Sequence, residues 1–388
     1  MVVNSPKLRV CISGSYGGMN LGDEAILEGI LTELSKHVTA EMTVLSRNPE
    51  DTLARHGVAH SLDARTLTKT EMRAKLEGTD LFILGGGGIL YDGDADAYLR
   101  DVFLAHELGI PVVVYAISAG PLTHEATRRA VRDGLDQASL VTVRDRQAYR
   151  LLEDVGVRRE MVLTADPAFL LEPEELPVET LEAEGVELDR QLVGFSVREP
   201  GPAAPDIDPD EYHALLANAA DFIIERYDAE VVFVPMEKAD VQHSHGVVAH
   251  MKNAERAEIL RRRYSPRQIL DLMGRFQLAV GMRLHFLIFA ALRGTAFTAL
   301  PYASKVSGLL EHLRIETPPM AHIGIGQLIA RIDRAWDRRH AIRTQIEERL
   351  PELKRHARQT NELLVEMLEQ HPIESAAVSQ PPASQAHH

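Results

Sequence analysis

Short apolar runs alternate along this chain with segments in which apolar residues recur every three or four positions. The short runs predict buried strands, and the longer repeat predicts amphipathic helices. In the first half the predicted strands are Leu8–Ile12, Glu41–Leu45, Leu81–Leu84, Val112–Ser118, Leu140–Val143 and Met161–Thr164. The predicted helices are Glu24–His37, Ala95–Leu108, Glu125–Gln137 and Arg146–Val155. Strands and helices that alternate in this way predict βαβ units and a doubly wound parallel sheet.

The alternation resumes after a Pro- and Glu-rich stretch at Glu172–Pro177. The second set of predicted strands is Leu192–Val197, Glu230–Val234, Gln277–Gly281 and Thr295–Leu300. Its predicted helices are Pro209–Tyr227, Ala254–Tyr264, Pro266–Arg275 and His285–Leu292. The sequence therefore predicts two Rossmann-like α/β domains that face a cleft, at residues 1–175 and 191–332, joined by a linker at 176–190.

The C-terminal part of the chain departs from this alternation. Residues 333–371 are predicted to be helical, with a break or kink at Pro351, because proline lacks the amide hydrogen that a helix needs. Such a segment would be able to pack back across the first domain. Residues 372–388 are rich in Ser, Ala, Gln and Pro, a composition typical of disorder.

Composition excludes several classes of protein. The net charge of -15 argues against a nucleic-acid binder, which needs a basic face to meet phosphates. The only cysteine, Cys11, lies in the first apolar run and is expected to be buried, so a disulfide framework and a thiolate metal site are excluded. Neither a signal segment nor an apolar run of membrane-spanning length is evident. We therefore expect a soluble, cytoplasmic protein with at most peripheral membrane contact.

A glycine-rich turn at Ser13–Gly22 links the first strand to the first helix. Ligands commonly bind at such turns, but here the helix opens with Asp23 and Glu24, which would repel a phosphate. The glycine spacing also differs from the dinucleotide fingerprint. The turn is thus expected to meet sugar hydroxyls or to supply a base. Tyr16 would stack on a sugar ring, and Asn20 would either hydrogen-bond to the sugar or serve as a local turn residue.

Four consecutive glycines, Gly85–Gly88, follow a predicted strand and leave bare backbone that a ligand can approach. They are not a P-loop, because the required Gly-Lys-Ser/Thr does not follow. Asp92, Asp94 and Asp96 come next. For Asp94 and Asp96 a solvated loop and helix cap explain the residues as well as sugar binding does.

Basic residues gather in the second domain where strands end. Arg283 and His285 lie between a strand and a helix, where a cation, an imidazole and free backbone amides favour an anion. Arg198 ends one strand, and Lys305 follows another. The carboxyl ends of parallel strands share one edge of a sheet, so these side chains are expected to converge. The alternative is that Arg283 pairs with a neighbouring carboxylate and His285 only caps the helix.

Two weaker groups are interpreted structurally. His243, His245 and His250 would tempt a metal assignment, but zinc needs three or four converging ligands, so we expect a loop at the cleft. In that loop Glu237 or Asp240 would contact substrate. Asp145 and Asp166 are expected to pair with Arg144 or to cap turns, and they are left out of the catalytic set.

Several of these motifs together resemble the polysaccharide pyruvyl transferase family, in the family's order over roughly residues 8–320. The blocks that carry the resemblance are Gly14–Leu27, Asp80–Ile89, Ser118–Pro121, Val143–Asp145, Thr164–Pro167, Gly281–His285 and Tyr302–Val306. The resemblance implies a GT-B-like fold and transfer of a pyruvyl group from phosphoenolpyruvate to two hydroxyls of a glycan sugar. The product would be a cyclic ketal, phosphate would be released, and neither a metal nor a further cofactor is implied.

Roles for individual residues follow from the motifs and the resemblance together. The predicted donor site consists of Arg198, Arg283, Leu284, His285 and Lys305. His285 would be the general acid, since imidazole titrates near neutral pH, or would bind phosphate only. Asp23 or Glu24 would orient or deprotonate the acceptor. The predicted acceptor contacts are Gly14, Tyr16, Asn20, Gly22, Gly86, Gly87, Asp92 and Glu237.

Two other functions remain open at this stage. A GT-B glycosyltransferase that uses a nucleotide sugar would share the fold and the basic site, but no acidic residue is clearly placed for a ribose. A non-catalytic glycan-binding subunit of a polysaccharide assembly complex would not need the Arg283 and His285 pair. The expected partners are phosphoenolpyruvate and a glycan, with lipid linkage of the glycan and homo-oligomerisation left open.

Overall fold

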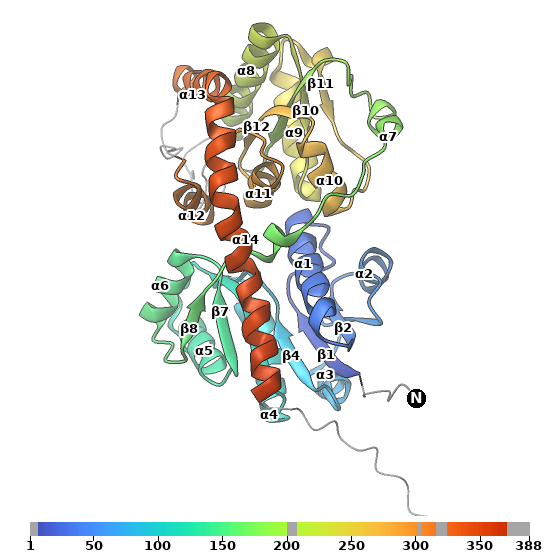
Figure 1. The fold of residues 1–388 in the computed structure, drawn as a ribbon, viewed down its shortest axis with the longest axis vertical. Helices are drawn as coiled ribbons and strands as arrows, with labels where there is room; N and C mark the ends of the chain where they lie inside the picture. The colour runs from blue at the N-terminus through green and yellow to red at the C-terminus, as the bar shows by residue number, and fades with distance from the viewer. Residues whose placement is uncertain (1–6, 200–207, 301–303, 316–323, 371–388) are drawn as a thin grey trace, which may run out of the picture.

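The computed structural model describes residues 7–199, 208–300, 304–315 and 324–370. Figure 1 shows two α/β domains, one above the other, with a long helix running along both. The predicted tail at 372–388 lies outside the described residues.

The first domain is built on a parallel sheet of eight strands. They are β1 (Leu8–Ser13), β2 (Ala40–Ser46), β3 (His60–Asp63), β4 (Leu81–Leu84), β5 (Gly87–Leu90), β6 (Val112–Ala119), β7 (Leu140–Val143) and β8 (Met161–Leu163). The helices are α1 (Leu21–His37), α2 (Pro49–His56), α3 (Lys69–Leu76), α4 (Ala95–Glu107), α5 (Glu125–Asp136) and α6 (Arg146–Val155). The order β3-β2-β1-β4-β6-β7-β8 reverses between β1 and β4, and β5 pairs with β6. Ligands bind outside the carboxyl ends of strands at such a reversal.

The second domain repeats this plan on a smaller scale. Its parallel strands are β9 (Gln191–Ser196), β10 (Ala229–Phe233), β11 (Ala257–Ile259), β12 (Phe276–Gly281) and β13 (Phe297–Ala299), in the order β11-β10-β9-β12-β13. The helices are α7 (Val178–Glu182), α8 (Pro209–Tyr227), α9 (Lys238–His250), α10 (Pro266–Met273), α11 (Leu284–Leu292), α12 (Ser304–Leu313) and α13 (Ile325–Asp337). The order reverses between β9 and β12, the position at which ligands bind in sheets of this kind.

Two predicted elements are wrong. The helix expected at Ala254–Tyr264 is a short 3-10 turn followed by β11, because Ala257 and Ile259 enter the core while Glu258 between them stays at the boundary, a period of two. The loop expected around His243 is α9, which starts at a capping box: Glu237 and Asp240 each accept a hydrogen bond from the other's backbone amide.

The C-terminal helix α14 (Arg339–Gln370) runs through Pro351, so the chain breaks at Arg338 instead. Ile346, Leu353 and Ala357 of α14 are buried in the main core cluster of the second domain. Further along, Leu364 enters a core cluster of the first domain with Val10 and Ile12. The helix therefore packs across the first domain, an arrangement that the sequence permitted.

Polar contacts reinforce this end of α14. The Thr360 hydroxyl contacts the Thr142 and Thr164 hydroxyls at 3.2 and 3.0 Å. The Asn361 amide donates to the Glu33 carbonyl at 3.3 Å.

Across the part of the chain that the structure describes, none of the helices combines the length and apolar character that a membrane crossing requires.

Truncating the buried contact of α14 tests whether the helix fastens the first domain. Leu364→Ala should lower the free energy of unfolding by about 2–4 kcal/mol, because a fully buried leucine leaves a cavity. Glu362→Ala, on the exposed face of the same helix, should change it by less than about 0.5 kcal/mol. Urea unfolding measures both, and equal values for the two variants would contradict the packing described here.

Candidate active site between the two domains

A polar cavity of about 240 Å³ lies where the two domains meet. It is formed by loops at the carboxyl ends of strands in both sheets, together with the start of α4. Its first-domain lining is Ser15, Asn20, Asp23, Arg47, Gly88, Ile89, Tyr91, Asp94, Tyr98 and Arg144. Its second-domain lining is Met236, Arg283, Leu284 and His285.

The start of α1 forms one wall of the cavity. Asn20 caps the helix, since its side-chain oxygen accepts from the Gly22 amide at 2.9 Å and from the Asp23 amide at 3.4 Å. Its side-chain nitrogen donates to Glu237 of the second domain at 3.2 Å. The Asn20 amide group thus serves the cap and the domain contact, while Asp23 in the first helical turn lines the cavity.

Glu24 is placed differently from Asp23. Its side chain is 1 % exposed, with one oxygen 2.9 Å from the Gly17 amide and the other 2.8 Å from His56 Nε2. The structure does not bring Glu24 into the cavity, and the assignment of Glu24 as a base is corrected. Its carboxylate fixes the glycine-rich turn instead.

Tyr16 is also inside the protein. It is fully buried, and the close approach of its ring and hydroxyl leaves no room for a side chain at Gly14 or Gly85. The expected stacking of Tyr16 on a sugar is therefore wrong. Gly14 and Gly85 allow the turn to pack onto Tyr16, a constraint that apolar patterning alone does not show.

Gly85 and Gly86 of the glycine run after β4 pack against the protein, whereas Gly88 lines the cavity. A side chain at Gly86 would lie 3.1 Å from the Ala116 carbonyl and from Ile26, while Gly87 has a φ of +102°, which favours glycine. Asp92 does not line the cavity. It accepts from the Thr123 amide at 2.8 Å, the Thr123 hydroxyl at 2.6 Å and the His124 amide at 3.1 Å, and so fixes the start of α5. The acceptor role predicted for Asp92 is corrected accordingly.

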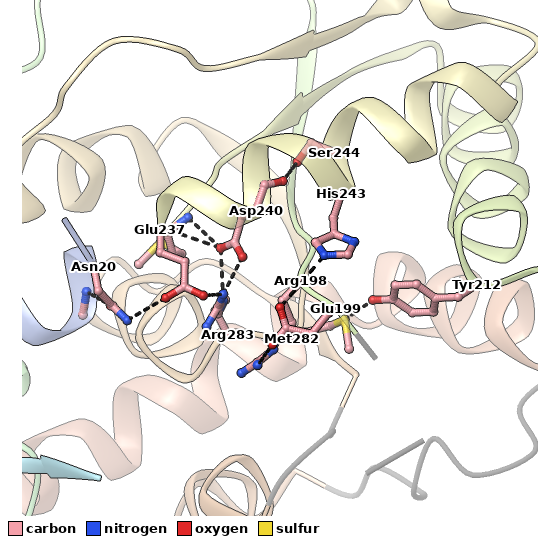
Figure 2. A network of polar contacts seen from close by, with 12 residues as sticks. Asn20, Arg198, Glu199, Tyr212, Glu237, Asp240, His243, Ser244, Met282 and Arg283 are labelled. Atoms are coloured by element: carbon pink, nitrogen blue, oxygen red, sulfur yellow. Dashed lines mark hydrogen bonds and ion pairs between the residues drawn. The ribbon is translucent and has the colours of Figure 1, made fainter. Parts of the chain in front are cut away.

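Arg283 is the N-cap residue of α11. The carboxylates of Glu237 and Asp240, at the start of α9, lie around its side chain, as Figure 2 shows. Its Nε donates to Asp240 at 3.0 Å, and its terminal nitrogen contacts both Asp240 and Glu237. The Asp240 side chain is wholly buried. The positive charge of Arg283 is therefore largely balanced inside the protein, the alternative that the sequence left open, although Arg283 still lines the cavity.

His285 crosses to the first domain. Its Nε2 lies 3.4 Å from Asp166, and its ring packs against Gly22, where an added Cβ would lie 2.0 Å from Nδ1. Asp166 is buried and forms an ion pair with Arg144. Burial alone would raise the pKa of Asp166, but Arg144 and His285 outweigh it and hold that pKa well below its usual range. Asp166 is therefore an ionised carboxylate that orients the His285 ring.

The remaining predicted donor residues are placed less centrally. Leu284 lines the cavity, whereas Arg198, paired with Glu199, does not. Figure 2 places Arg198 near Met282 and Tyr212. Lys305 is in the first turn of α12, but its side chain lies outside the described residues.

Two arginines at the cavity were not predicted. Arg144 follows β7 and its side chain is 4 % exposed, while Arg47 follows β2 and donates to the Ser15 hydroxyl at 2.6 Å. Both stand directly after a strand, so the rule that placed Arg198 and Arg283 would also have selected them. Tyr91, Asp94 and Tyr98 also line the cavity. For Asp94 the sequence had left sugar binding and helix capping equally open.

The histidines of α9 meet another histidine rather than the cavity. His213 Nε2 lies 3.1 Å from His243 Nδ1, and the His250 ring is nearby. Within the described ranges, the structure places no three His, Cys, Asp or Glu side chains so that they could hold a metal ion.

A sequence model of the polysaccharide pyruvyl transferase family matches residues 20–304, which includes most of the cavity lining. The chain belongs to this family. The amylovoran biosynthesis protein AmsJ of Erwinia amylovora is 22 % identical over 399 residues, which cover 87 % of this chain and 94 % of that protein. The family membership supports a transferase role for the protein.

Solved structures share the fold at low sequence identity. The UDP-GlcNAc 2-epimerase of Neisseria meningitidis superposes with a TM-score of 0.66 and 11 % identity, covering 94 % of this chain and 100 % of that one. A glycosyltransferase from Rickettsia africae gives a TM-score of 0.62 and 12 % identity, with coverages of 94 % and 100 %. The predicted GT-B-like arrangement of two parallel-sheet α/β domains is thus confirmed.

Gly22 allows the His285 ring to approach α1, and an added methyl group tests this contact. Gly22→Ala should displace the ring and lower turnover about tenfold or more, because small misplacements at a reacting centre are costly. Gly326→Ala, at the same second position of helix α13 but with open space around it, is the matched control. Steady-state kinetics with unfolding temperatures would check both, and a Gly22→Ala variant with full activity would contradict the assigned contact.

The ion pair of Asp166 predicts a pH-dependent stability. Because the folded pKa lies below the unfolded value of about 3.9, its stabilisation is present above that value and is lost as the pH falls. Asp166→Asn should cost about 3 kcal/mol at pH 7, since Arg144 is left buried without its counter-charge. The difference from wild type should narrow below about pH 4. Urea unfolding at both pH values measures it, and a constant difference would refute the ionised pair.

Proposed function

We propose that the protein transfers a pyruvyl group from phosphoenolpyruvate to two hydroxyls of a glycan sugar, giving a cyclic ketal and phosphate. The observation that supports this most directly is the cavity lining, where Arg47 and Arg144 of the first domain meet Arg283 and His285 of the second. Phosphoenolpyruvate carries a carboxylate and a phosphate, and guanidinium groups suit both. The N-terminus of α11, where His285 begins the helix with Leu284, adds backbone amides that favour an anion.

The arginines at the cavity have different roles in the two domains. Arg283 is already paired with Asp240 and Glu237, so its main contribution is to hold the α11 terminus in place. Arg144 is paired with Asp166, has Asp145 4.0 Å from its Nε, and reaches the cavity near Gly88. We assign Arg144 and Arg47 as the first-domain cations of the donor site.

The proposed transfer proceeds in two steps at C2 of the donor. One sugar hydroxyl adds to C2 of the enol while His285 gives a proton to C3, which becomes a methyl group. The second hydroxyl then attacks C2, and the bond from C2 to the phosphate oxygen breaks. One hydroxyl proton ends on C3 by way of the imidazole, and the other leaves with phosphate. Asp23, which lines the cavity, would take up a hydroxyl proton in transit. The balance needs no further cofactor.

Binding of the donor separates this function from its competitors. Phosphoenolpyruvate at about one hundred times its dissociation constant should add about 2.7 kcal/mol to the stability of the folded protein, seen as a higher unfolding temperature. Arg283→Ala should lose this increase, whereas Arg293→Ala, at the far end of α11, should keep it. His285→Gln should keep the increase and lose turnover, because the general acid is removed while the arginines remain.

Two outcomes would redirect the assignment. An unfolding temperature raised by a UDP- or GDP-sugar but not by phosphoenolpyruvate would favour a nucleotide-sugar glycosyltransferase. A protein that responds to neither donor, and that binds glycans without turnover, would be a glycan-binding subunit. Because Arg283→Ala also leaves buried Asp240 unpaired, the comparison uses the donor-induced increase and not the absolute unfolding temperature.

A further inference from the structure

A second cavity of about 330 Å³ adjoins the first on the side of β1, β2 and β3. It is made wholly by the first domain, at the carboxyl ends of these three strands and along the start of α4. Arg47, Asp94 and Tyr98 line both cavities, so the two cavities are neighbours that share these side chains. A molecule in the second cavity would therefore lie beside a donor in the first.

We infer that this second cavity holds the acceptor sugar, a pyranose whose two reacting hydroxyls point past Asp94 and Tyr98 toward the donor. The inference rests on the proposed function and adds to it the position of the acceptor. Of the acceptor contacts expected from the sequence, Gly14 lines this cavity, whereas Tyr16, Gly86 and Asp92 are buried or engaged elsewhere.

The lining has the two kinds of surface that a sugar needs. Leu45, Ala64, Ala97 and the Tyr98 ring offer apolar surface for the C–H face of a pyranose. Arg65 brings a polar group, whereas the buried Ser46 hydroxyl is engaged by the Thr52 hydroxyl and the Asn48 amide. The volume falls within the usual range for a small-molecule site. Arg100, in contrast, is occupied by Asp101 and by the Ala64 and Leu67 carbonyls, so it shapes the cavity and does not receive a ligand.

Asp94 occupies the position where the acceptor would react. The Tyr91 hydroxyl donates to it at 3.1 Å, and Arg65 lies 3.6 Å away. An ionised carboxylate only accepts hydrogen bonds, so a sugar hydroxyl would donate to it and be aimed at the donor cavity. Ketal formation uses two hydroxyls, and the two carboxylates that line the donor cavity, Asp23 and Asp94, stand on different elements, α1 and the loop before α4.

Filling the second cavity tests the inference without touching the donor site. Ala97 is exposed on α4 and lines the second cavity only, so Ala97→Trp should block the acceptor and leave the fold intact. Asp96→Trp adds the same bulk one residue earlier, at a position that lines neither cavity, and is the matched control. The probes are phosphoenolpyruvate and a panel of 4-nitrophenyl pyranosides, with phosphate release as the readout.

For Ala97→Trp we expect kcat/KM for the pyranoside to fall about tenfold or more, equal to about 1.4 kcal/mol, while phosphoenolpyruvate still raises the unfolding temperature. Asp96→Trp should match wild type in both. Asp94→Asn should lower kcat while the phosphoenolpyruvate response is kept. Pyranoside kinetics unchanged in Ala97→Trp and Asp94→Asn would overturn the acceptor position alone. A wild-type chain that neither responds to phosphoenolpyruvate nor releases phosphate would overturn the proposed function, and this inference with it.

Discussion

The contact on which the site depends is the buried set Arg144, Asp166 and His285. Asp166 is held ionised in the first domain by Arg144, and it orients a histidine that belongs to the second. A buried ion pair is costly to form and costly to break, so it is a strong constraint on geometry even when its net contribution to stability is small. The imidazole thus comes from the second domain, and the charges that position it come from the first.

Charged side chains elsewhere at the domain junction are also paired. Arg283 is matched by Asp240 and Glu237, and Glu237 in turn accepts from Asn20 of the first domain. Charges in the cleft are therefore fixed by partners before any ligand arrives. Preorganised groups of this kind act on a reacting centre without having to rearrange, which is where electrostatic catalysis gains most. The GT-B-like scaffold and these ion pairs together fix the positions of the charged groups at the domain junction.

Much of the fold could be predicted from apolar periodicity, since β4, β7, α6 and α8 have the expected bounds. Two strands could not: β11 lies in a segment whose pattern indicated a helix, and half of β5 belongs to the glycine run, although β8, which also has three residues, was predicted. Some site residues could be predicted from the sequence and others could not. Strand ends located Arg283 and His285, whereas Glu24 and Tyr16 look reactive in sequence but are buried by the turn that surrounds them. Burial is a property of packing, which one sequence does not display.

The long helix α14 has a mechanical consequence. Its first half is bound into the second domain through Ile346, and its last turns are bound into the first through Leu364. Any rotation of one domain against the other must therefore bend this helix or strip one of its ends. Pro351 lacks an amide hydrogen, but Ile346 and Leu353 on either side of it are buried in the same core cluster, so the proline lies within the anchored stretch. The helix passes from one core cluster to the other between Ala357 and Leu364, and this is the section that a rotation of the domains would bend.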